Sequence, residues 1–319
     1  MSEILLQAKQ ISKHFGGVTA LDKVDLTIKK GEIHCLMGEN GCGKSTLIKI
    51  ISGFYRPDGG SITFEGKEYD RLSIAESIGL GIQVIYQDMS IFPNLTVAEN
   101  IAINNELYNH RKLVNWKSVK SIAKEALDHI GIELPLQAVV GELSVADKQL
   151  IAIARAILNN SKLIIMDEPT SALTRKEVDK LFKVIRQLQK EGISTLFVSH
   201  KLDEVFEIAD QFTVFRNGKL VVADSAKNIN DEQFVYYMTG RKLEEAAFTP
   251  EKIDHDRAIL KVENLGLTNG FEKISFEIHP GEILGITGLL GSGRTELAKT
   301  LFGLYSATEG HIYIDGTEV

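Results

Sequence analysis

The sequence lacks the features that mark membrane-spanning, secreted and nucleic-acid-binding proteins. None of its 319 residues belongs to an apolar run of about 18 or more, so no segment is expected to cross a bilayer as a helix. Residues 1–10 lack the basic stretch and apolar core of a secretory signal. The formal net charge is −7, which argues against a broad nucleic-acid-binding surface because such surfaces are basic.

Cysteine is scarce as well. The only two, Cys35 and Cys42, lie in an apolar stretch and in a glycine-rich stretch, which suits a reducing compartment better than a disulfide framework. The apolar share of 44% and the charged share of 25% are those of a soluble globular protein. The length allows one large domain or two ordinary ones.

A phosphate-binding pattern organises the chain. Residues 38–46 fit G-x-x-x-x-G-K-[ST], and they are Gly38, Glu39, Asn40, Gly41, Cys42, Gly43, Lys44, Ser45 and Thr46. Residues 33–37 have the pattern of a buried strand, and residues 47–51 that of a helix, which Gly53 can end. Strand, glycine loop and helix are the setting that the pattern requires, which disfavours a chance glycine-rich turn.

The chemistry of this loop follows from its residue types. Glycine lets backbone N–H groups turn toward phosphate oxygens, and the helix N-terminus adds its positive dipole end. Lys44 is expected to reach the β and γ phosphates, and the Ser45 hydroxyl to bind Mg²⁺.

The chain contains an internal repeat. Residues 24–33 reappear as residues 274–283, and Gly38 has its counterpart 250 residues later in Gly288. The same spacing relates further pairs of glycines: Gly41 and Gly291, Gly43 and Gly293, Gly53 and Gly303, Gly60 and Gly310, Gly66 and Gly316. We therefore expect a first domain over residues 1–240, a charged linker over 241–258, and part of a second copy over 259–319.

Strands and helices are predicted to alternate through the first copy. Buried or alternating strands are expected at 4–8, 24–28, 61–64, 82–86, 163–166, 193–199, 211–216 and 219–223. An all-helical insert is expected at about 95–158 and a further helix at 178–188. Asp58–Gly60 and Asn217–Gly218 have the composition of hairpin turns. The pattern predicts a doubly wound α/β domain of the P-loop NTPase type.

Polar residues follow several of these strands. Asp167 and Glu168 end the strand at 163–166, which we expect to lie beside the strand of the phosphate loop. There Asp167 would hold Mg²⁺ and Glu168 would polarise the attacking water; the alternative is an exposed acidic pair. Gln87 and His200 follow two other strands and would face the same sheet edge, Gln87 as a further Mg²⁺ ligand and His200 as a partner of the γ-phosphate.

Phe15 is a candidate for the adenine-binding aromatic residue. It lies on the connection between the first two strands, where its ring could stack on adenine. A core position is the alternative. A structural role likewise stays open for Gln87 and His200.

The order of these motifs resembles the nucleotide-binding subunit of an ABC transporter over residues 4–240, and in part over 259–319. The motifs are the phosphate loop, Gln87, the helical insert, Leu143-Ser144-Val145-Ala146-Asp147, Asp167-Glu168, Ser171-Ala172-Leu173 and His200. The resemblance implies ATP and Mg²⁺ as cofactors, Phe15 as the adenine partner, Gln87 as the link to a membrane partner and His200 as the switch histidine. Leu143–Asp147 would be the signature that reaches the other copy's ATP in a head-to-tail dimer.

Three features resemble those of the simple-sugar importers, which serve ribose, galactose, arabinose, xylose or autoinducer-2. They are the two fused copies, Met238–Arg241 before the linker, and Arg294 in the second loop. Residues 91–97 resemble the importer segment that meets a membrane-domain helix. The resemblance implies an ATP-hydrolysing subunit at the cytoplasmic membrane face, with transmembrane permease subunits and, indirectly, a periplasmic or extracellular sugar-binding protein as partners. The alternatives are a soluble ABC-type ATPase acting on ribosomes or DNA, and an inactive ATP-binding fragment.

The sequence departs from the family pattern in the signature and in the second phosphate loop. Ala146 and Asp147 replace the second glycine and the glutamine of the signature, and we expect the Ala146 methyl to crowd the backbone that approaches the γ-phosphate. Arg294 and Glu296 replace the lysine and threonine of the second loop. We expect one hydrolytic site, at Lys44 and Glu168, and one degenerate site. Because the second copy lacks a signature, the chain alone should bind ATP-Mg²⁺ but hydrolyse it slowly.

Overall fold

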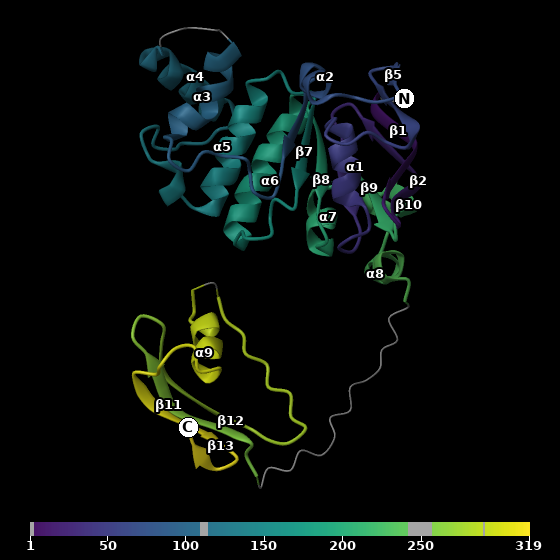
Figure 1. Ribbon diagram of the computed structural model, residues 1–319. Coiled ribbons are helices and arrows are strands. Elements are labelled where there is room, and N and C mark those ends of the chain that lie inside the picture. Colours follow the sequence, from purple (N-terminus) through teal and green to yellow (C-terminus); the bar gives the residue numbers. More distant parts are fainter. Residues whose placement is uncertain (1–2, 109–113, 242–256, 290) are drawn as a thin grey trace. The chain divides into compact units, whose positions relative to one another are not determined.

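The computed structural model describes residues 3–108, 114–241, 257–289 and 291–319. The chain divides into two compact units, Met1–Leu243 and Glu244–Val319 (Figure 1). Most of the linker predicted at 241–258 lies outside the described residues. Within the described ranges, no helix is long and apolar enough to cross a membrane.

A six-stranded sheet forms the centre of the first unit. Its order is β10-β9-β3-β8-β7-β6, with β3 (Ile33–Met37), β6 (Ile82–Ile85), β7 (Leu163–Asp167), β8 (Ser194–Val198), β9 (Gln211–Arg216) and β10 (Lys219–Ser225). All neighbours are parallel except β9 and β10. Asn217 and Gly218 join these two with φ of 52° and 74°, so the predicted hairpin is confirmed.

An antiparallel sheet of order β2-β1-β4-β5 accompanies it. Its strands are β1 (Ile4–Phe15), β2 (Val18–Lys29), β4 (Gly59–Phe64) and β5 (Lys67–Tyr69). The hairpin turn predicted at Asp58–Gly60 is wrong, because Gly59 and Gly60 belong to β4, which pairs with the distant β1. The chain reverses instead at Glu65–Gly66, where both residues have positive φ and lead into β5.

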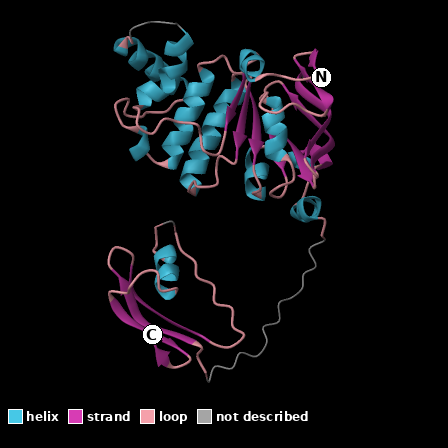
Figure 2. Ribbon diagram, viewed as in Figure 1, coloured by secondary structure: helices cyan, strands magenta, loops and turns pink. Residues whose placement is uncertain are grey.

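Two hydrophobic cores lie on opposite faces of the central sheet, because alternate side chains of each strand point to opposite sides. Ile164 and Met166 of β7 belong to one core, and Leu163 and Ile165 to the other. Helix α1 (Lys44–Ile51) packs into the second core with the antiparallel sheet. Most of the other helices pack into the first core (Figure 2).

The segment between β6 and β7 is mainly helical. It contains α3 (Val97–Tyr108), α4 (Trp116–His129), the 3₁₀ turn Val140–Glu142 and α5 (Val145–Ile157). The remaining elements of the first unit are α2 (Ile74–Gly79), α6 (Arg175–Lys190), α7 (Leu202–Ile208), the 3₁₀ turn Ala226–Asn228 and α8 (Asp231–Thr239). In Figure 1, α3 and α4 stand at the end of the unit away from β1 and β2.

The second unit is smaller. It contains β11 (Leu260–Leu267), β12 (Phe271–Ile278), α9 (Arg294–Leu301), β13 (Glu309–Ile314) and β14 (Thr317–Glu318). Its sheet has the order β12-β11-β13-β14. The core consists of Val262, Leu265, Phe271 and Leu297 with half-buried neighbours.

Candidate functional site

The phosphate loop connects the fully buried β3 to α1, the context predicted from the sequence. Two glycines are required by close backbone approaches. Gly38 has φ of 147°, and an added Cβ would lie 2.3 Å from the Phe215 carbonyl oxygen. Gly43, the N-cap of α1, has φ of 104°, and its Cβ would lie 2.5 Å from the Ala20 carbonyl oxygen. The loop therefore fits between β9 and β2 only without side chains at these positions.

Lys44 is buried over this loop. Its Nζ donates to the carbonyl oxygens of Gly38 at 2.6 Å and Glu39 at 3.0 Å. The Cys42 side chain is buried too, and this burial raises the pKa of its thiol. Cys42 therefore stays protonated and serves as a packing residue. The Lys44 ammonium lies within the loop to which the sequence pattern assigns phosphate binding.

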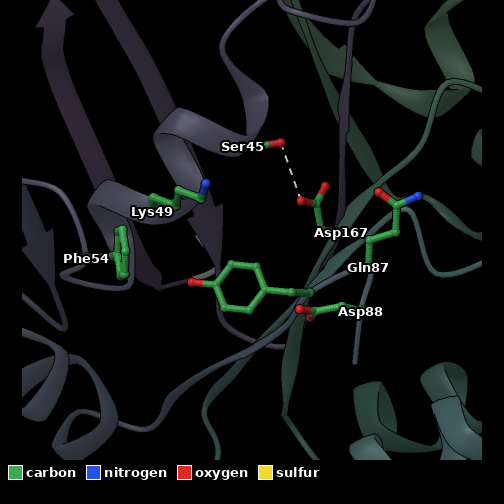
Figure 3. A pocket seen from close by; sticks show the side chains of 7 residues that line it. Ser45, Lys49, Phe54, Gln87, Asp88 and Asp167 are labelled. Atoms are coloured by element: carbon green, nitrogen blue, oxygen red, sulfur yellow. Dashed lines mark hydrogen bonds between the residues drawn. The ribbon is translucent and has the colours of Figure 1, made fainter. Parts of the chain in front are cut away.

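Ser45 and Asp167 form a candidate magnesium site. Ser45 Oγ donates to Asp167 Oδ2 at 3.4 Å, and Gln87 lines the same pocket (Figure 3). Burial, and secondarily the neighbouring charge of Glu168, raises the pKa of Asp167, so a cation would stabilise its ionised form. No cluster of three or more His, Cys, Asp or Glu side chains suited to a metal occurs among the described residues. One carboxylate, one hydroxyl and one amide fit Mg²⁺, which commonly takes its other ligands from phosphates and water.

Glu168 and His200 meet at the adjacent carboxyl ends of β7 and β8. His200 Nδ1 lies 3.3 Å from Glu168 Oε1. The Glu168 N–H donates to the Val198 carbonyl oxygen at 3.1 Å, and Glu168 has a positive φ of 49°. A carboxylate and an imidazole this close together can share a proton, which is the chemistry of a general base and its partner.

The strand arrangement differs from the prediction in one respect. The strand that carries Asp167 does not lie beside the strand of the phosphate loop, because β8 lies between β7 and β3. Ser45 and Asp167 still meet, since α1 follows the loop across the carboxyl edge of the sheet. Local sequence patterns carry no information on which strand enters between two others.

Phe15 is not a core residue. It ends β1, its side chain is 41% exposed, and its ring lies 5.2 Å from that of Tyr55 in an edge-to-face arrangement. Lys13 Nζ lies 5.4 Å from the ring centroid of Phe15. A partly exposed ring of this kind can receive a planar base.

Four further residues belong to the site, and no motif in the sequence marks them. Lys49, Phe54, Tyr86 and Asp88 line a cavity of about 610 Å³ together with Ser45, Gln87 and Asp167 (Figure 3). Lys49 lies one helical turn after Ser45, and Tyr86 and Asp88 flank Gln87, so the sequence signal for these three is their spacing from predicted site residues. Phe54 is exposed, and no pattern in the sequence indicates it.

The predicted signature, Leu143–Asp147, forms the start of α5. Ser144 is the N-cap: its Oγ accepts from the Asp147 N–H at 3.1 Å and donates to Asp147 Oδ2 at 2.9 Å. Val145 is exposed. The expected crowding by Ala146 is wrong, because Ala146 is buried on the inner face of the helix. The departure at the helix start is therefore the half-buried Asp147, which accepts the hydrogen bond of the Ser144 hydroxyl and adds negative charge to a helix N-terminus.

The signature and the phosphate loop belong to opposite faces of the central sheet. The buried side chains of α1 contribute to one core and those of α5 to the other. No described hydrogen bond or ion pair joins residues 143–147 to residues 38–46. One unit therefore does not bring its own signature to its own phosphate loop.

The loop of the second unit has a different charged residue. Gly293 caps α9 with φ of 83°, matching Gly43, and Arg294 begins the helix where Lys44 begins α1. Arg294 is exposed, whereas Lys44 is buried against its loop. Glu296 lies in the first turn of α9.

Phosphate loop, strand-end carboxylates and helical insert define a P-loop nucleotide-binding protein. The chain belongs to the ABC transporter family, whose model matches residues 21–171 and 271–319. Among solved structures, the ADP conformation of MJ1267, an ATP-binding cassette of an ABC transporter, is 29% identical with a TM-score of 0.66, covering 74% of this chain and 98% of that one. The dimeric, ADP- and Pi-bound cassette MJ0796 is 25% identical with a TM-score of 0.61, covering 70% and 100%.

Curated relatives are sugar-import proteins by name. The ribose import ATP-binding protein RbsA of Caldanaerobacter subterraneus is 43% identical over 99% of this chain and 64% of its own length. RbsA of Clostridium tetani is 45% identical over 98% of this chain and 62% of its own length. The galactose/methyl galactoside import ATP-binding protein MglA 1 of Photobacterium profundum is 43% identical over 100% of this chain and 64% of its own length. The chain thus spans about three fifths of the length of the curated relatives it matches.

Proposed function

We propose that this chain is an ATP-binding subunit that couples ATP hydrolysis to the import of a monosaccharide-like solute through a partner permease. The observation that carries the proposal is the pairing of Ser45 with Asp167 and of Glu168 with His200 at one sheet edge. The names of the relatives, which match nearly the whole chain, supply the solute class.

The residues divide the chemistry as follows. The loop N–H groups and Lys44 would hold the β and γ phosphates, and Phe15 would receive the adenine ring. Ser45, Asp167 and Gln87 would hold Mg²⁺, which neutralises developing charge during phosphoryl transfer. Glu168 would orient and deprotonate water, and His200 would hydrogen-bond that water or the γ-phosphate.

Efficient hydrolysis by this arrangement requires a second copy of the domain. Because α1 and α5 pack on opposite faces of the sheet, the Lys44 site must take its signature from another unit, in a head-to-tail pair. A dimeric cassette with bound ADP and Pi is among the similar structures. We expect the isolated chain to bind ATP-Mg²⁺ and to turn it over slowly.

The test is a pair of substitutions with separate measurements of binding and turnover. Glu168→Gln should keep ATP binding and lower hydrolysis about 100-fold or more, because it removes the base and not the phosphate contacts. Lys44→Ala should weaken ATP binding itself. Hydrolysis that survives both substitutions at the wild-type rate would contradict the assignment. Hydrolysis absent from the wild type under every dimerising condition would favour an inactive ATP-binding protein.

The permease would contact the face around Gln87. Phe54 is exposed and lines the cavity that contains Gln87 and Asp167, and Phe92, which follows Gln87 by five residues in the chain, is exposed as well. Exposed aromatic side chains next to a nucleotide-sensing residue suit a helix of a membrane partner. The protein would then lie at the cytoplasmic face of the membrane, with a periplasmic or extracellular sugar-binding protein as an indirect partner.

A soluble ABC-type ATPase acting on ribosomes or DNA is the less favoured function. The names of the relatives and the net charge of −7 support the importer. Fractionation of the source cells distinguishes the two. Membrane-bound protein is expected for the importer, and protein confined to the soluble fraction would favour the alternative.

We also propose that the second unit is the beginning of a second nucleotide-binding domain. In its sheet, β11 pairs with β12 as β1 pairs with β2 in the first unit, and the paired residues of β12 lie 250 positions after those of β2. The corresponding pairs are Leu6–Ile28 and Ala8–Leu26 in the first unit, and Leu260–Ile278 and Val262–Phe276 in the second. The contact of Lys49 Nζ with the Tyr55 ring, at 5.5 Å, recurs between Lys299 and Tyr305 at 5.2 Å.

A head-to-tail pair of domains has two ATP sites, each formed by the phosphate loop of one domain and the signature of the other. We expect these two sites to be unequal. In a head-to-tail pair, the site containing Lys44 and Glu168 would meet the signature of a complete second domain. The site containing Arg294 would meet the Leu143–Asp147 signature of another copy, where Asp147 accepts the hydrogen bond of the Ser144 hydroxyl. Two carboxylates, Glu296 and Asp147, would then face one triphosphate, so this site would bind nucleotide weakly.

A further inference from the structure

The two residues that flank His200 are held by one buried carboxylate. Glu204 lies on α7 and is only 4% exposed. Its Oε2 accepts a hydrogen bond from Ser199 Oγ at 2.6 Å, and its Oε1 lies 3.1 Å from Lys201 Nζ. Ser199 Oγ in turn accepts from the Lys201 N–H at 3.0 Å. Both neighbours of His200 thus depend on the same side chain.

Lys201 extends this arrangement to the segment that follows Glu168. Its Nζ donates to the Thr170 carbonyl oxygen at 2.9 Å, and the same oxygen accepts from the Leu173 N–H at 3.2 Å. Thr170 is buried. The loops after β7 and β8 are therefore joined at two points, by Lys201 to Thr170 and by His200 to Glu168.

His200 needs such support because packing does not hold it. Its side chain is 49% exposed, and its 3.3 Å contact with Glu168 joins it to the loop that follows β7. The reach of an exposed imidazole toward Glu168 depends on where its backbone lies, because the backbone fixes the position of its Cβ atom and limits the rotamers it can adopt. The buried Glu204 carboxylate supplies that constraint, since a buried charge stays close to its compensating cation and hydrogen-bond donors.

We propose that Glu204 is a positioning residue that, through Ser199 and Lys201, sets the place of His200 relative to Glu168. The proposal rests on the proposed ATPase function, in which Glu168 and His200 handle the attacking water. Without the Glu204 charge, the Lys201 side chain, which is 40% exposed, would turn into water and release Thr170. The two loops could then separate by small distances, to which catalytic rates are sensitive.

The experiment compares four variants of the full chain. Glu204→Gln keeps the size of the side chain and an acceptor for Ser199, but cannot neutralise Lys201. Lys201→Met removes the ammonium alone, and Lys201→Arg restores a cation. Glu207→Gln is the matched control, because Glu207 lies on the same helix in an ion pair with Arg175 at the surface.

Two measurements are made on each variant. The first is the rate of ATP hydrolysis as a function of ATP concentration. We expect Glu204→Gln and Lys201→Met to lower kcat about tenfold to a hundredfold at unchanged KM, with Lys201→Arg closer to the wild type and Glu207→Gln unchanged. The second is the NMR spectrum of isotope-labelled histidine at one pH, with the His200 signal assigned from a His200→Gln spectrum. We expect that signal to move in the first two variants.

The outcomes separate this proposal from the proposed function. If the His200 signal and kcat of Glu204→Gln match those of the Glu207→Gln control, the positioning role is wrong. A raised KM with unchanged kcat would also overturn it, since that pattern indicates weakened ATP binding and not a displaced Glu168–His200 pair. If Glu204→Gln does not fold, Lys201→Met decides. If the wild type does not hydrolyse ATP, the ATPase function fails, and the histidine spectra alone decide whether Glu204 positions His200.

Discussion

At the scale of single residues, the phosphate loop depends on backbone positions that favour glycine. Gly38 and Gly41 both have positive φ in the phosphate loop, but their surroundings differ. A Cβ on Gly38 would collide with the Phe215 carbonyl oxygen, while nothing lies within 4 Å of a Cβ on Gly41. The two positions therefore separate the effect of backbone conformation from the effect of a steric clash.

This difference predicts unequal effects of alanine. Gly38→Ala should weaken ATP binding more than about tenfold, because the loop must move away from β9 and its N–H groups lose their alignment. Gly41→Ala should cost only the strain of a positive φ, about 1 kcal/mol of stability. Isothermal titration with ATP-Mg²⁺ and urea unfolding measure the two quantities. Equal losses of ATP affinity in both variants would show that the close approach at Gly38 does not matter.

At the scale of elements, the start of α5 combines a good helix cap with a poor anion site. Ser144 and Asp147 satisfy each other through two hydrogen bonds. Such a cap stabilises a helix by about 1 kcal/mol. The same arrangement leaves a carboxylate where the resemblance to ABC proteins implies a contact with the γ-phosphate of another copy's ATP.

We therefore expect Asp147→Gln to raise ATP hydrolysis by the isolated chain at high protein concentration, where two copies can pair. The substitution removes the negative charge and frees the Ser144 hydroxyl. Glu142→Gln is the control, because it removes an exposed negative charge in the preceding turn without touching the cap. Steady-state hydrolysis across a range of protein concentrations measures the effect. An equal rise with Glu142→Gln would assign it to net charge, and no rise would remove Asp147 as the cause of slow turnover.

At the scale of the whole molecule, the two units use related segments differently. Ile33 in β3 is completely buried between β8 and β9, whereas Ile283, which is 250 residues further along, is 82% exposed and lies outside the strands of its unit. The local sequences are alike, with Gly-Glu-Ile at 31–33 and at 281–283. Their environments differ because, among the described residues, strands flank this segment on both sides in the first unit and not in the second.

The stability of the chain should respond accordingly. Ile33→Ala should destabilise the first unit by about 2–5 kcal/mol, since it leaves a cavity in a closed core. Ile283→Ala should change the free energy of unfolding of the second unit by less than about 0.5 kcal/mol. Urea unfolding followed by circular dichroism, with hydrogen exchange of β12 and α9 reporting on the second unit, measures both. A large loss with Ile283→Ala would mean that residues 283–287 are packed in solution.

Several features of the molecule were determined by the sequence alone, because they depend on neighbouring residues. The phosphate loop needs glycines at fixed spacing, and the Asn217–Gly218 hairpin needs two residues that accept positive φ. The family follows from the order of such local motifs. The hairpin predicted at Asp58–Gly60 failed because neighbouring residues do not distinguish a glycine turn from a glycine-containing strand. Gly59 and Gly60 instead allow β4 to pair closely with the distant β1.

The tertiary structure alone decided which residues meet. The strand order, with β8 between β3 and β7, the exposure of Phe15, and the inward position of Ala146 all result from contacts between segments far apart in the chain. The same holds for the cavity that adds Lys49 and Phe54 to the site, and for the buried carboxylate of Glu204 beside His200. Periodicity and motif spacing describe one segment at a time, whereas these features depend on how several segments pack together.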